Sequence, residues 1–118
     1  MRIYEITMDD REPAKLTLNL GALAALSVED HDLWVRYNTL YKKIQRNEAP
    51  DELEMGDLMY IAYRCAALHG EGEPMSRMEF LTALTDDREE IGNVFQKLYG
   101  VQEKKQAFQK PSGKQRKR

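Results

Sequence analysis

Cys65 and His69 are the two side chains whose types and spacing most directly suggest chemistry. Both residue types bind metal ions, and a separation of four residues places them on one face of a helix. His31 could add a third ligand. Zinc sites that sequence alone identifies carry paired motifs such as CxxC or HExxH, and neither motif is present. Cys65 has apolar neighbours, which favours a small core residue. We therefore expect no metal and no cofactor, and a metal-dependent activity is the weakest hypothesis.

Carboxylates are the second group that could catalyse a reaction, because paired acids act as general acid and base. They gather in two runs, Glu29, Asp30 and Asp32, and Asp86, Asp87, Glu89 and Glu90. Both runs fall where helices are predicted to begin, and there the helix dipole and unpaired amides favour acids. The chain has no glycine-rich phosphate loop and no GxSxG nucleophile motif. We expect no catalytic residue and no enzymatic activity.

Charge divides the chain near Gly100. The net charge of the whole chain is −2, but residues 101–118 carry +6, which leaves residues 1–100 with −8. The seven cations of the tail are Lys104, Lys105, Lys110, Lys114, Arg116, Lys117 and Arg118. A basic tail can bind nucleic acid through phosphates, so a small nucleic-acid-binding or regulatory module is the alternative hypothesis. Because the attached body is acidic, we favour a solvated, disordered tail and do not expect nucleic acid as a partner.

The elements that would position these residues begin with a hairpin. Apolar residues alternate with polar ones over 4–8 and again over 16–20, and residues 9–13 between them have turn composition. An isolated two-stranded ribbon is marginal in water, so its apolar face should lie on helices. A short helical turn or connection is expected at 21–26.

Four helices follow, each marked by capping residues. Ser27 and Asp30 predict the start of a helix over 27–46, and Asp51 with Glu54 predicts a second helix that ends near Gly70. A short helix is expected after Ser76, and a last helix is expected to end at Gly100. No internal repeat is visible.

The second of these helices is apolar on two faces. One face holds Leu58, Ile61, Ala62 and Cys65, and the other holds Met59, Tyr60, Tyr63, Ala66 and Ala67. A helix that is apolar all round is usually buried, so either both faces belong to the core or one meets a partner. If the second face binds a partner, the contact residues we predict are Met59, Tyr60 and Tyr63.

Length and composition are those of one small domain. The chain has 118 residues, 42% of them hydrophobic and 32% charged, and no apolar stretch is long enough to span a bilayer. The single cysteine agrees with a reducing compartment. We expect one α+β domain over 1–100, in which the hairpin packs on a mainly helical body, with the tail over 101–118.

The order of elements resembles that of the tail assembly chaperones of long-tailed bacteriophages and related prophages. The likeness lies in the hairpin, the Gly/Ala/Leu turn at 20–23, the apolar helix around 57–68, and the segment 75–81 that leads into a Ser-x-x-Glu-Phe helix. It covers about residues 1–100. The Lys104-Lys105 pair also fits a slippery codon run, where members of this family commonly shift frame.

The resemblance implies a non-enzymatic protein of the bacterial host cytoplasm. Such a chaperone forms homo-oligomers and keeps the tape-measure protein soluble during tail morphogenesis, until the tail tube protein replaces it. No membrane is involved. The mechanism this implies is burial of apolar surface against a client, with many weak contacts acting together.

Overall fold

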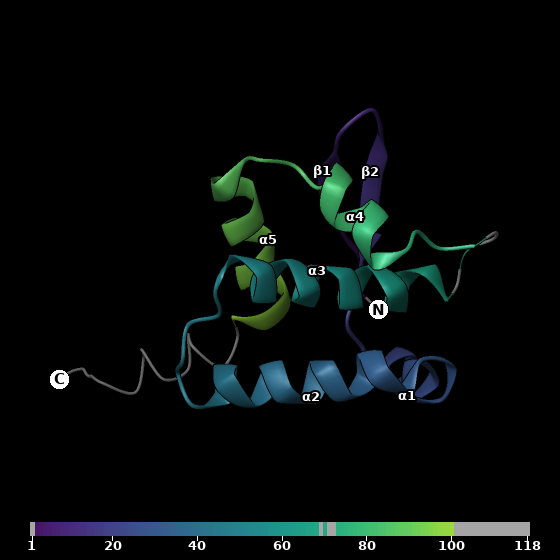
Figure 1. The fold of residues 1–118 in the computed structure, drawn as a ribbon, viewed down its shortest axis with the longest axis vertical. Helices are drawn as coiled ribbons and strands as arrows, with labels where there is room; N and C mark the ends of the chain where they lie inside the picture. The colour runs from purple at the N-terminus through teal and green to yellow at the C-terminus, as the bar shows by residue number, and fades with distance from the viewer. Residues whose placement is uncertain (1, 69, 71–72, 101–118) are drawn as a thin grey trace, which may run out of the picture.

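The computed structural model describes residues 2–68, 70 and 73–100, and it has the expected α+β fold. A two-stranded antiparallel hairpin is followed by five helices (Figure 1). The elements are β1 (Tyr4–Met8), β2 (Arg11–Leu16), α1 (Leu20–Glu29), α2 (His31–Gln45), α3 (Glu52–Ala67), α4 (Arg77–Ala83) and α5 (Arg88–Tyr99). Among the described residues, no helix is long and apolar enough to cross a membrane.

The second strand differs from its prediction. It runs over Arg11–Leu16 rather than over 16–20, because the reversal of the chain is confined to Asp9 and Asp10. Asp10 has a φ of 57°, a left-handed conformation that aspartate tolerates better than most residues do. Beyond the strand, Leu20 is not a third inward apolar residue but the first residue of α1, and it is 82% exposed.

The next boundary differs as well. Residues 20–29 form a full helix, α1, capped by Asn19, whose side chain accepts a hydrogen bond from the Ala22 amide at 2.7 Å. Ser27 does not cap a helix, because it lies inside α1 and its hydroxyl donates to the Ala24 carbonyl. Asp30 is the cap of α2, so the predicted helix over 27–46 begins four residues late.

The remaining caps confirm their predictions. Asp51 and Glu54 form a reciprocal capping box at the start of α3, and Ser76 and Glu79 form another at the start of α4. Gly100 is the C-terminal cap of α5, as expected.

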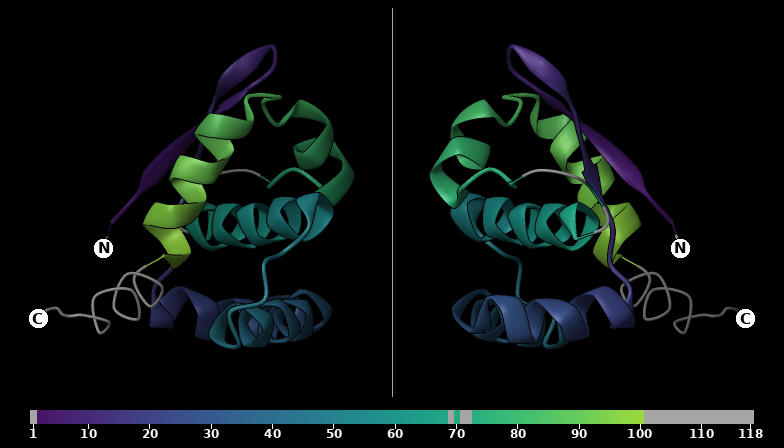
Figure 2. Two further views of the ribbon diagram at one scale, coloured as in Figure 1. Left: turned by 90° about the vertical axis from the view of Figure 1, so that its left-hand side faces the viewer. Right: turned by 90° about the vertical axis from the view of Figure 1, so that its right-hand side faces the viewer.

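The helices lie in layers with α3 in the middle. In Figures 1 and 2, α1 and α2 lie on one side of α3, and the hairpin, α4 and α5 lie on the other. Ile6 of β1 and Leu16 of β2 have no exposed surface, so the prediction that the apolar face of the hairpin lies on helices is confirmed. The outer edge of β1 is covered too, because the Thr85 amide donates to the Thr7 carbonyl and Met8 bridges to Leu84.

Candidate protein-binding surface

The predicted contact residues Met59 and Tyr60 lie inside the fold. Met59 is 0% exposed and Tyr60 4%, because the face of α3 that carries them is covered within the chain. The Tyr60 hydroxyl donates to the Met75 carbonyl at 2.9 Å, and its ring packs on Phe80 with the centroids 5.5 Å apart. The first half of this face therefore belongs to the core, as one of the two sequence-based interpretations of α3 has it, while the second half, from Tyr63 on, is half-buried. We do not retain Met59 and Tyr60 as contact residues.

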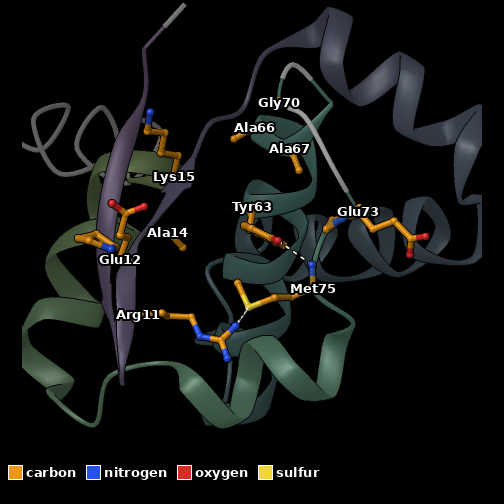
Figure 3. A pocket seen from close by; sticks show the side chains of 12 residues that line it. Arg11, Glu12, Ala14, Lys15, Tyr63, Ala66, Ala67, Gly70, Glu73 and Met75 are labelled. Atoms are coloured by element: carbon orange, nitrogen blue, oxygen red, sulfur yellow. Dashed lines mark hydrogen bonds between the residues drawn. The ribbon is translucent and has the colours of Figure 1, made fainter.

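Tyr63, the third predicted contact, remains half-buried. Its hydroxyl accepts a hydrogen bond from the Met75 amide at 2.7 Å, and its ring stacks on Phe80 at 5.1 Å. It borders a pocket of about 480 Å³ between β2 and the second half of α3 (Figure 3). This pocket is the surface at which Tyr63 remains accessible.

The pocket beside Tyr63 is poorly suited to strand addition. Its wall on the hairpin side is β2, and Pro13 within that strand has no amide hydrogen to donate. The register of the hairpin also shifts between Ile6 and Met8, so the strand pair is irregular there. Proline, irregular pairing and the charged side chains of Arg11 and Lys15 are common protections of a strand edge against pairing with another chain.

Among the described residues, the two most exposed large hydrophobic side chains lie on α1. Leu20 is 82% exposed and Val28 is 86% exposed. Gly21, Ala24 and Ala25 are exposed as well. With 3.6 residues per turn, these five positions cover one continuous arc of the helix, and the arc carries no charge. We call these five residues the outer face of α1.

The opposite side of α1 fixes the helix to the body. Ala22, Leu23 and Leu26 are buried in the core, with Leu26 fully covered. The helix is therefore held in place by one apolar side while a second apolar side remains in water. An exposed contiguous apolar surface of this kind is typical of an interaction site.

An acidic corner follows the outer face where α1 meets α2. It consists of Glu29, Asp30 and Asp32. Arg64 of α3 pairs with Glu29 at 3.3 Å and with Asp30 at 3.2 Å, and its side chain is only 13% exposed. The three carboxylates and one guanidinium give the corner a net charge of −2. The C-terminal carbonyls of α1 and the N-terminal amides of α2 meet at this corner, so the two helix dipoles oppose each other there.

Behind the corner, a buried carboxylate joins three helices. Asp57 of α3 is 2% exposed and accepts hydrogen bonds from Arg36 of α2, at 3.0 and 3.2 Å. It also accepts from Arg77 of α4 at 2.7 Å, which raises the pKa of that guanidinium. Charge-assisted pairs of this geometry satisfy a carboxylate that would otherwise be costly to bury. Nothing in the sequence pattern marked Asp57, because it lies within an apolar helix.

The structure gives Cys65 the role of a core residue. Its side chain is 0% exposed, and burial raises the pKa of the thiol to about 11. Metal-binding cysteines are thiolates, and a protonated buried thiol is a poor ligand. Among residues 2–68, 70 and 73–100, no three acidic, histidine or cysteine side chains are grouped to hold a metal ion. His69 and the seven cations of the tail lie outside the described residues.

Comparison with known proteins gives no family. No known family, no curated protein and no solved structure matches this chain. The assignment of function therefore depends on the surfaces described above.

Sequence reasoning missed the outer face of α1. The signal was present, because residues 20–28 contain no charged side chain. The sequence analysis predicts only a short helical turn or connection at 21–26, and six residues are too few to present a face to a partner.

Proposed function

We propose that this chain is a non-enzymatic tail assembly chaperone that forms homo-oligomers and binds the tape-measure protein in the cytoplasm of the bacterial host. The observation that carries the proposal is the outer face of α1, where Leu20 and Val28 stay exposed on a helix whose other side is anchored in the core. The order of elements, with a hairpin followed by a helical body, agrees with that family. The tail tube protein would then displace the chaperone.

Such a chaperone binds its client through many weak contacts, each of which buries a small apolar area. Apolar area contributes roughly 25 cal/mol per Å² when it leaves water, so a face of three helical turns gives modest affinity to one subunit. A long client offers many such sites, and oligomeric subunits bind them with avidity. Each contact still breaks readily, which lets a second protein replace the chaperone.

Co-expression with a tape-measure fragment tests the proposal. The fragment alone should aggregate. In the presence of the full chain it should remain in the supernatant and co-elute with the chain in size-exclusion chromatography with light scattering. An unrelated aggregation-prone protein serves as the control for non-specific solubilisation. A strictly monomeric chain that leaves the fragment in the pellet would contradict the proposal.

The charge of the C-terminal tail supports one alternative, a nucleic-acid-binding module. Residues 101–118 carry +6, and seven cations on a single strand would give a salt slope of about −5. Only this alternative requires binding to disappear when 101–118 are deleted. A mobility shift across a salt series, with the full chain and the truncated chain side by side, separates the two functions.

A further inference from the structure

We infer that the outer face of α1 receives a helix of the client, and that this helix carries lysine or arginine where it meets the acidic corner. The inference rests on the proposed function and goes further, because it names the chemistry of the bound segment and the residues that select it. Three features carry it: the shape of the face, the charge at its end, and the composition of α1 itself.

The shape of the face suits a helix. The middle of the face is formed by the small residues Gly21, Ala24 and Ala25. The larger side chains of Leu20 and Val28 lie at its two ends and project further from the helix. Small residues in the middle let another helix approach closely, to the 8–10 Å between axes that packed helices adopt. The ten residues of α1 give a contact about 15 Å long.

The charge at the end of the face determines which charge a partner helix should carry there. Glu29 follows Ala25 by one turn, so it lies at the border of the face, and its side chain is 53% exposed. Asp32 is exposed too. Arg36 and Arg77 lie in the hollow behind the corner, but both bind Asp57, and counting this trio the region still carries −1. A cation beside the corner is therefore favoured and a carboxylate is disfavoured.

Helix α1 of a second copy fits the face less well. Residues 20–29 contain no lysine and no arginine, so a second α1 would cover the apolar surface but leave the acidic corner without a counter-charge. A basic client helix does both. We therefore assign the face to a client helix and treat self-association through α1 as an outcome that the experiment must detect.

Two synthetic helical peptides test the assignment on the full chain. Both have about 20 residues, long enough to hold a helix, and share one Ala/Leu face. One carries lysines at its ends and the other carries glutamates. Fluorescence anisotropy of the labelled peptides should give a Kd about tenfold lower for the lysine peptide, which corresponds to about 1.4 kcal/mol. Equal affinities would overturn the role of the corner.

Three variants locate the binding. Val28→Asn places a neutral polar group on the face without touching the core or adding charge beside Glu29, and it should weaken the lysine peptide by about tenfold. Asp32→Asn should weaken it by about two- to threefold, and less at high salt. Leu53→Asn, on α3, changes an apolar side chain that is 56% exposed and should have no effect. Binding that is insensitive to Val28→Asn would overturn the site.

Sedimentation velocity of the same variants reports self-association. If Val28→Asn dissociates an oligomer and leaves the peptide affinity unchanged, the face binds a second copy and the inference is wrong. If the lysine peptide binds the face but the tape-measure fragment does not bind the chain, the proposed function fails, while the site and its preference for a basic helix stand. If the fragment binds equally well to Val28→Asn, the function stands and the inference fails.

Discussion

Helices α1 and α3 have the same kind of sequence and opposite surroundings. Both are apolar on more than one side. In α3, the seven consecutive residues 56–62 are all buried, because the helix lies between the α1/α2 layer and the hairpin with α4. In α1, only Ala22, Leu23 and Leu26 are buried, while Leu20 and Val28 remain in water. The place of a helix in the layers, rather than its composition, decides how much of its apolar surface is covered.

The charges of the two helices sharpen the contrast. The buried helix α3 carries Asp57, neutralised by Arg36 and Arg77, and the outer helix α1 carries no charge before Glu29. Outer helices normally place their polar residues toward solvent. An outer helix without them has an apolar face that its own chain does not cover, and this asymmetry is the basis of the proposed function.

The largest effect expected from the comparison is on stability. Ile61→Ala in α3 removes a fully buried side chain and should lower the free energy of unfolding by about 2–5 kcal/mol, through lost burial and the cavity left behind. Val28→Ala in α1, where the side chain is 86% exposed, should change it by no more than about 0.5 kcal/mol. Urea unfolding measures both. Similar losses for the two variants would mean that α1 is covered in solution.

The next effect concerns the buried charge. Asp57→Ala should lower the free energy of unfolding by about 2–3 kcal/mol, because Arg36 and Arg77 lose their partner. The expected loss of stability is smaller than for a fully buried ion pair. The two arginine side chains are 39% and 43% exposed, so water can solvate them once the carboxylate is removed. Glu52→Ala is the matched control, because its ion pair with Arg88 lies on the surface. An Asp57 variant as stable as the control would show that the three helices do not depend on this carboxylate.

The predictions from sequence agree with the structure where nearby residues determine the local structure, and they differ from it where packing between distant elements does. Both capping boxes were predicted, because cap and partner are three residues apart. The start of α2 was missed, since Ser27 and Asp30 are both acceptable caps and only the length of α1 excludes Ser27. The burial of Met59 and Tyr60 was one of two open alternatives. The order of the layers settled it, and that order depends on contacts far apart in the chain.

The core around α3 also predicts sensitivity to alkali. Burial raises the pKa of Tyr37 to about 12, raises that of Cys65 to about 11, and raises that of Tyr99 well above its ordinary value. The unfolded chain loses these protons from about pH 9–10, so the stability they contribute is present below that range and is lost as pH rises toward 11–12.

Urea midpoints measured between pH 8 and pH 11 check this. The midpoint should fall over that interval, and Tyr37→Phe should fall less steeply, because the variant has no phenol to ionise at that position. Parallel curves for the variant and the original chain would show that Tyr37 is not held in its neutral form by the fold.

The smallest expected effect on stability comes from substitutions in the outer face of α1 alone. These substitutions test whether the face is a contiguous apolar surface or a set of scattered apolar residues. The double variant Leu20→Ser and Val28→Ser should keep its urea midpoint close to that of the original chain, since both side chains are exposed. It should lose most of the fluorescence of an uncharged solvatochromic dye such as Nile red, because the dye requires contiguous apolar surface. The matched control, Leu53→Ser with Met78→Ser, removes two side chains that are 56% and 65% exposed on different helices. If the control variant lowers the dye fluorescence as much as the α1 variant does, the face of α1 does not differ from the rest of the surface. The contrast with α3 would then have no bearing on binding.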